Sequence, residues 1–281
     1  MFAWVSVCGE RPAVMGIVNV TPDSFSDGGR YLDVEAAVAH GHALASAGAT
    51  LLDVGGESTR PGASPVDEHE ERRRVLPVIE RLAADAGVPV SVDTTKATVA
   101  AAALDAGAVI VNDVSAGRQH PAMLEVIADR GAGFVVMHML GEPRTMQDDP
   151  RYDDVVVEVG DFLLDRLEAA RSAGIPDAAL AADPGIGFGK TAAHNLTLLA
   201  RLDELHDRVA VPVVVGPSRK RFLGALLRDA TGAEPPPEER DDATLATVVW
   251  ALGHGARVVR VHAVRPAAQA VALLDALREA A

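Results

Sequence analysis

The feature that most constrains the fold of this chain is an alternation of short β-branched apolar runs with longer alanine-rich segments of helical periodicity. Eight such units follow one another, and this order is typical of repeated βα units rather than of separate β and α layers. The pattern predicts helical crossovers, among them residues 33–47, 66–86, 95–106 and 155–173. It predicts strands at residues 14–20, 50–55, 88–93, 109–114, 134–138, 180–183, 211–216 and 257–262.

The length of 281 residues suits one barrel, and no long Ser/Gly-rich or Pro-rich linker divides the chain. We therefore expect a single α/β domain over residues 1–281, a (β/α)8 TIM barrel. The alternative is a doubly wound open sheet, which usually has a glycine-rich dinucleotide loop after its first strand. No such loop occurs there, and the glycines at 185, 187 and 189 follow the sixth predicted strand instead.

The formal net charge of -14 predicts a mostly negative outer field, so we expect neither nucleic acid nor an anionic membrane as a partner. An anionic substrate then requires a local basic pocket. Cys8 is the single cysteine and has no identified base partner, which favours a structural role. Without a signal-peptide pattern or a membrane-spanning apolar run, the predicted compartment is the cytoplasm. Residues 229–241, with three consecutive prolines, are predicted to form an exposed excursion.

Polar residues stand at or just beyond the end of every predicted strand. One such residue alone is readily explained as a turn or helix-cap residue. In a barrel, however, the carboxyl ends of all strands meet at one mouth, which is where active sites lie. The recurrence therefore indicates an active site built from Asn19, Asp53, Asp93, Asn112, Asp113, His138, Asp183, Ser218, Lys220, Arg260 and His262.

Two groups of these side chains suggest two subsites. Two carboxylates and a carboxamide suit a planar heterocycle with amidine-like N–H donors and one carbonyl, such as a pterin. Their positions are Asp93, Asn112 and Asp183, with Lys220 as a donor to the ring and with Met137, Phe188 and the apolar stem of Arg260 covering its faces. The second group resembles an anion site and consists of Asn19, Arg60, Arg260 and His262.

Two loops are dense in turn formers, hydroxyls and glycines, at residues 21–29 and 55–63. Such loops are able to close over a substrate, although loops of this kind also serve as plain connectors. Arg60 lies in the second loop, where a solvated surface charge is the alternative interpretation.

The motifs in the chain resemble those of the dihydropteroate synthase family from Val14 to the last predicted strand. The matching segments are MGIVNVTPDSFSDGG at 15–29, DVGGESTRPGA at 53–63, SVDTTK at 91–96, VNDVSAG at 111–117, DPGIGFGKTAAHNL at 183–196, GPSRKRFLG at 216–224 and RVH at 260–262.

This resemblance implies condensation of 6-hydroxymethyl-7,8-dihydropterin diphosphate with p-aminobenzoate, assisted by Mg2+, to give 7,8-dihydropteroate and pyrophosphate. It implies a homodimer formed through the later helices. It assigns the pterin to Asp93, Asn112, Asp183 and Lys220, with Met137, Phe188 and Arg260 packed near the ring. It assigns the diphosphate to Asn19, Arg260 and His262, with Asn19 near the metal. The p-aminobenzoate side, where sulfonamides compete, is assigned to Thr59, Arg60, Pro61, Phe188, Ser218 and Lys220.

The mechanism that fits is loss of pyrophosphate to leave a pterin-stabilised carbocation, which the aromatic amine attacks. Among the expected catalytic residues, Asp53, Asp93 and Asp183 stabilise the positive charge on the pterin, and Lys220 donates to the ring. Arg260 and His262, with Mg2+, stabilise the departing anion.

The chain departs from the family pattern at Ala263, where an aspartate usually follows RVH. Two rival functions remain open: a pterin-binding methyltransferase barrel that serves a corrinoid partner, and a pterin-binding paralogue without turnover. A methyltransferase needs no diphosphate site, and Ala263 is the best support for the paralogue.

Overall fold

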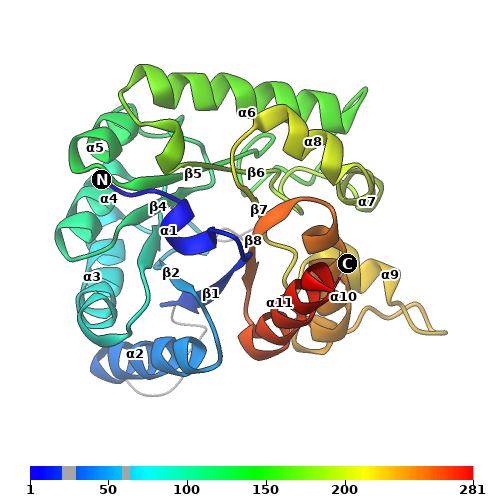
Figure 1. Ribbon diagram of the computed structural model, residues 1–281, viewed down its shortest axis with the longest axis horizontal. Coiled ribbons are helices and arrows are strands. Elements are labelled where there is room, and N and C mark those ends of the chain that lie inside the picture. Colours follow the sequence, from blue (N-terminus) through cyan, green and yellow to red (C-terminus); the bar gives the residue numbers. More distant parts are fainter. Residues whose placement is uncertain (21–29, 59–63, 281) are drawn as a thin grey trace.

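The computed structural model describes residues 1–20, 30–58 and 64–280. In these ranges eight parallel strands close into a barrel in sequential order, with β8 pairing back onto β1, so the predicted (β/α)8 fold is confirmed. Figure 1 shows the helices arranged around the sheet. The strands are β1 (Ala13–Asn19), β2 (Leu51–Gly55), β3 (Val90–Asp93), β4 (Ile110–Asp113), β5 (Gly133–Met137), β6 (Leu180–Asp183), β7 (Val213–Val215) and β8 (Ala256–Val261).

The predicted crossover helices are present, with ends shifted by a few residues. Side-chain caps explain two of the starts: Asp67 accepts hydrogen bonds from the backbone at the start of α3, and Asp154 does so at the start of α6. The outer helices are α2 (Arg30–Ser46), α3 (Glu68–Asp85), α4 (Ala97–Asp105), α5 (Met123–Arg130), α6 (Val155–Ser172), α7 (Ala192–Ala200), α8 (Leu202–Val209), α9 (Arg221–Leu226), α10 (Asp241–Gly253) and α11 (Val264–Glu279).

The amino-terminal segment closes the end of the barrel opposite the site. Trp4, next to the short helix α1 (Val5–Cys8), is fully buried, and its indole nitrogen donates to the Ala179 carbonyl at 3.0 Å. It packs in one apolar cluster with Met15 and Ile110 from the barrel interior. Cys8 lies in the same cluster, where burial raises the pKa of its thiol. A raised pKa disfavours the reactive thiolate, which fits a structural role for this cysteine.

Above this apolar layer the interior becomes charged. Asp53 precedes the end of β2 by two residues and is completely buried, and Arg260 extends from β8 into the same layer. A barrel interior is normally filled by branched apolar side chains, so a buried ion pair at this level indicates a functional layer.

Most of the predicted excursion at 229–241 is exposed, but its last part is anchored. Arg240 is buried and donates to the carbonyls of Pro235 and Arg219, and Arg219 forms an ion pair with Asp241. The excursion therefore ends against the turn after β7 that carries Ser218 and Lys220.

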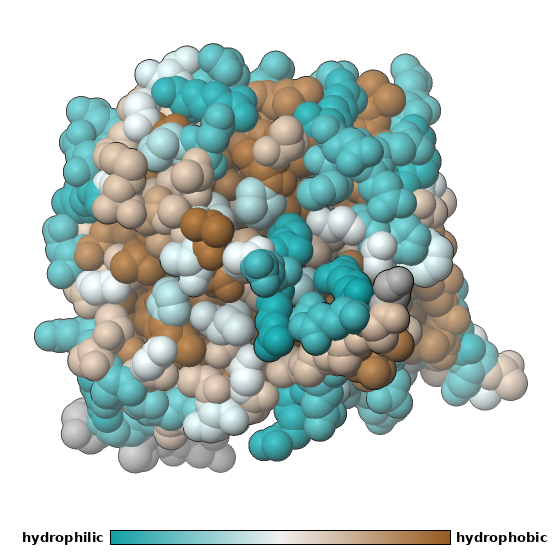
Figure 2. Space-filling model, in the orientation of Figure 1, coloured by the Kyte–Doolittle hydropathy of each residue, from teal (hydrophilic) through white to brown (hydrophobic). Residues whose placement is uncertain are grey.

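In the part of the chain that the structure describes, no helix has the length and apolar character needed to cross a membrane. Figure 2 shows hydrophilic side chains spread over the outer helices, with smaller hydrophobic areas between them.

Candidate active site

A buried charged layer forms the floor of the mouth of the barrel. The Arg260 guanidinium donates through Nε to Asp53 Oδ2 at 2.6 Å and through Nη2 to Asp93 Oδ2 at 2.8 Å. Asn112 Nδ2 donates to Asp53 Oδ2 at 3.0 Å. Asp93 and Asn112 are direct neighbours in the register of β3 and β4, which explains how residues distant in sequence meet here. One arginine thus holds two carboxylates from two strands.

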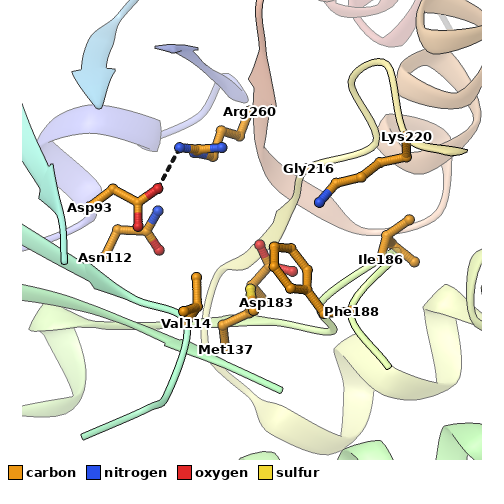
Figure 3. A pocket seen from close by; sticks show the side chains of 10 residues that line it. All are labelled: Asp93, Asn112, Val114, Met137, Asp183, Ile186, Phe188, Gly216, Lys220 and Arg260. Carbon is orange, nitrogen blue, oxygen red and sulfur yellow. Dashed lines mark hydrogen bonds and ion pairs between the residues drawn. The ribbon is translucent and has the colours of Figure 1, made fainter. Parts of the chain in front are cut away.

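A pocket opens above this layer. Figure 3 shows Asp93 and Asn112 on one side of it, Asp183 at its base, and Lys220 extending toward it from the turn after β7. The remaining wall is mainly apolar. The residues that line the whole pocket are Asp93, Asn112, Val114, Met137, Asp183, Ile186, Phe188, Gly216, Lys220 and Arg260. All seven residues that sequence reasoning placed around a pterin are therefore brought together.

Burial shifts the acidic groups of the pocket toward neutrality. It raises the pKa of Asp93 to about 7, because desolvation and the nearby Asp53 outweigh the attraction of Arg260. Burial also raises the pKa of Asp183 to about 6, although Asp183 accepts a 2.6 Å hydrogen bond from the Gly185 amide. Both groups can therefore gain or lose a proton near neutral pH when a ligand binds.

Lys220 and Phe188 form the opposite wall. The Lys220 ammonium lies 3.8 Å from the centroid of the Phe188 ring, a cation–π contact. Figure 3 shows the aromatic ring beside Asp183, with Lys220 above it. A flat ligand beside this pair meets an aromatic ring and a cationic donor together.

His262 is held at the rim of the mouth by Ser218. The Ser218 hydroxyl lies 2.9 Å from His262 Nδ1, and the His262 backbone amide donates to the same oxygen at 3.2 Å. Ala263 begins α11 without a side-chain cap. Ser218 therefore orients the imidazole in this chain without a carboxylate at position 263.

The predicted anion group is less compact than the predicted pterin group. Arg260 is paired with Asp53 and Asp93, whereas His262 pairs with Ser218, and Asn19 lies half-buried at the end of β1. Thr59, Arg60 and Pro61 lie outside the described residues, as does the loop at 21–29. Among the described side chains there is no cluster of three or more acidic, histidine or cysteine groups suited to a metal.

Sequence reasoning missed Lys190, which is buried beneath the pocket, and gave no separate role to its partner His138. The available signal was the lysine directly after the glycine-rich run at 185–189. A lysine there is expected to be solvated, and only the tertiary structure shows that it is not.

Acidic and amide groups lie beside an aromatic wall at the mouth of the barrel, and this arrangement is that of a pterin-binding (β/α)8 enzyme. Comparison with known proteins agrees with this class. Residues 15–262 match the family described as pterin binding enzyme. The dihydropteroate synthase of Mycobacterium leprae is 50% identical over 264 residues, covering 94% of this chain and 92% of the relative.

Solved structures extend the similarity to the fold. The Xanthomonas albilineans dihydropteroate synthase with 4-aminobenzoic acid superposes with a TM-score of 0.88 at 52% identity, covering 96% of this chain and 94% of that one. The Yersinia pestis dihydropteroate synthase in a sulfonamide drug complex gives a TM-score of 0.89 at 45% identity, with coverage of 96% and 95%.

The chain belongs to the dihydropteroate synthase family. Its activity is the condensation of 6-hydroxymethyl-7,8-dihydropterin diphosphate with p-aminobenzoate to give 7,8-dihydropteroate and pyrophosphate.

Proposed function

We propose that the pocket above the charged layer binds the pterin ring of the diphosphate substrate. The observation that carries this assignment is the convergence of Asp93, Asn112 and Asp183 on one cavity. The two carboxylates accept the N–H donors of the ring, and the Asn112 carboxamide can both donate and accept. Lys220 donates to a ring acceptor, while Met137 and Phe188 supply apolar contact.

The second substrate binds on the outer side of Phe188. Ser218 and Lys220 lie on the turn after β7 that borders the pocket, and the family resemblance adds Thr59, Arg60 and Pro61. Because the Yersinia pestis relative forms a sulfonamide complex, we expect sulfonamides to compete with p-aminobenzoate here.

The chemistry needs no protein nucleophile. The bond between the exocyclic methylene carbon and the diphosphate oxygen breaks, and the electron pair leaves with pyrophosphate. The aromatic amine then forms the new C–N bond and loses a proton. Asp93 and Asp183, with Asp53 behind them, stabilise the positive charge that develops on the pterin. His262 at the rim and Arg260 favour departure of the anion.

The donor set suits Mg2+ that arrives mainly with the substrate. Asn19 at the mouth offers one hard oxygen, and Mg2+ commonly takes its other ligands from phosphates and water. When bound, the ion would neutralise charge on the leaving pyrophosphate.

The test is formation of 7,8-dihydropteroate and pyrophosphate from the two substrates, followed with each component omitted in turn. We expect both products only when the pterin diphosphate, p-aminobenzoate and Mg2+ are all present. Binding of the pterin diphosphate without either product would identify a non-catalytic paralogue. Methyl transfer from a folate in place of condensation would identify the methyltransferase rival.

Pterin binding should release protons near pH 6. The raised pKa values leave Asp93 largely protonated and Asp183 about half protonated there, and ring N–H donors favour the ionised forms, so binding lowers both pKa values. Affinity should accordingly rise from about pH 5 to about pH 8. Calorimetry with a pterin lacking phosphate, in buffers of different ionisation enthalpy, measures the protons released. Asp183→Asn should reduce that number, whereas proton uptake at pH 6 would contradict the assignment.

Ala263→Asp should stabilise the protein without improving catalysis. The substitution supplies a side-chain cap for the uncapped start of α11, worth about 1 kcal/mol in the free energy of unfolding. Catalysis should change by less than about twofold, because Ser218 already orients His262. Urea unfolding and steady-state kinetics measure the two effects. A large gain in turnover would show that a carboxylate at position 263 is missing from the active site.

We also propose that the protein is a homodimer and works in the cytoplasm. Exposed apolar side chains on neighbouring outer helices support the dimer: Leu226 and Leu227 at the end of α9, and Val249 and Trp250 on α10. Sedimentation equilibrium measures the assembly directly, and a monomer at micromolar concentration would contradict the dimer.

A further inference from the structure

The turn between β6 and α7 is held by side chains at four backbone carbonyls. Its glycines 185, 187 and 189 all adopt positive φ, at 66°, 83° and 60°, where other residues are strained. Gln147 donates to the carbonyl of residue 187 at 2.7 Å, and the Tyr152 hydroxyl donates to that of residue 189 at 2.8 Å. Hydrogen bonds from side chains distant in sequence therefore hold this irregular turn in place.

Lys190 holds the other two carbonyls from below. Lys190 is 3% exposed, and its Nζ donates to the carbonyls of Gly185 and Phe188, both at 3.0 Å. Its third contact is His138 Nδ1 at 2.8 Å. Burial and the nearby ammonium lower the pKa of His138 to about 2, so the imidazole is neutral and accepts the third N–H of the lysine.

Lys190 does not line the pocket, but the residue that it holds does. Phe188 presents its ring to the cavity and carries the Lys220 ammonium on its face. The backbone carbonyl of the same residue accepts a hydrogen bond from Lys190. The position of the ring is therefore coupled to a buried amino group that lines neither the pocket nor the surface.

We propose that Lys190 is a positioning residue that fixes the Phe188 ring and thereby sets affinity for p-aminobenzoate. The proposal rests on the proposed function in one respect only, the placement of that substrate beside Phe188. Two of the pterin contacts, Asp93 and Asn112, come from other strands, so affinity for the pterin ring should depend less on Lys190 than affinity for p-aminobenzoate does.

The kinetic test compares Lys190→Met with Tyr152→Phe, which removes a hydrogen bond to the same turn at residue 189. Lys190→Met should raise the KM for p-aminobenzoate about tenfold or more, with less than about threefold change in pterin affinity. Tyr152→Phe should change either constant less than about twofold. In a Phe188→Leu background, Lys190→Met should have little further effect on KM, because the ring that it positions is gone.

A measurement on the ligand-free protein keeps the test independent of the reaction. The chain has six phenylalanines, and selective ring labelling with Phe188→Leu as the assignment control identifies the Phe188 NMR signal. Lys190→Met should shift that signal and Tyr152→Phe should leave it in place. If Lys190→Met fails to fold, Lys190→Gln, which keeps two of the three N–H donors, takes its place. An unmoved Phe188 signal, equal effects of the two variants, or additive losses in the double variant would overturn the proposal.

Discussion

Arg260→Met is expected to abolish measurable condensation and to destabilise the protein by about 3 to 5 kcal/mol. The substitution leaves Asp53 and Asp93 in a buried layer without their shared counter-charge. Asp53 is completely buried, so it cannot recover the loss by moving into water. Arg260→Lys should rescue only part of this loss, because an ammonium cannot reproduce the two directed contacts of the guanidinium.

Urea unfolding and product formation measure the two parts of this prediction. Arg257→Met is the matched control, because Arg257 lies on the same strand at the opposite end of the barrel and donates to the Cys8 carbonyl. We expect the control to retain activity. A stable Arg260→Met variant with normal turnover would show that the charged layer has no role in the reaction.

Asp93→Ala should weaken pterin binding by about 1 to 3 kcal/mol, and turnover should fall further. The variant removes an acceptor for the ring and unpairs the Arg260 Nη2 donor beneath it. Asp93→Asn keeps the size and one acceptor oxygen, so it separates the contribution of charge from that of shape.

Calorimetry for binding and steady-state kinetics for turnover distinguish these contributions. Asp105→Ala, which breaks an exposed ion pair with Arg130, is the control for loss of an aspartate. If Asp93→Asn binds pterin normally but turns over slowly, the carboxylate acts on the developing cation. Unchanged binding and kinetics in Asp93→Ala would contradict the assigned pocket.

The barrel could be predicted from the sequence because the spacing of apolar residues within each segment is a local property. β-Branched runs and alanine-rich helices alternate, and the polar residue ending each run marks the mouth, so Asp93, Asn112 and Asp183 could be placed together before any contact was known. All eight strands were found on this basis, although β7 is only three residues long.

The pairing inside the barrel could not be predicted in the same way. The direction of Arg260 depends on the register in which β8 meets β1, where it lies opposite Met15, and that register places its guanidinium against Asp53. Lys190 was missed for a related reason: its burial depends on His138, just after β5, and on the carbonyls of the turn after β6.

The most direct test of the central claim is a crystal structure of the protein with 7,8-dihydropteroate bound. We predict the pterin ring in the pocket above Arg260, with ring nitrogens about 3 Å from carboxylate oxygens of Asp93 and Asp183 and with Asn112 in hydrogen-bond contact. The p-aminobenzoate part should extend past Phe188 toward Ser218. A pterin ring bound elsewhere, or bound here without touching Asp93, Asn112 or Asp183, would contradict the account.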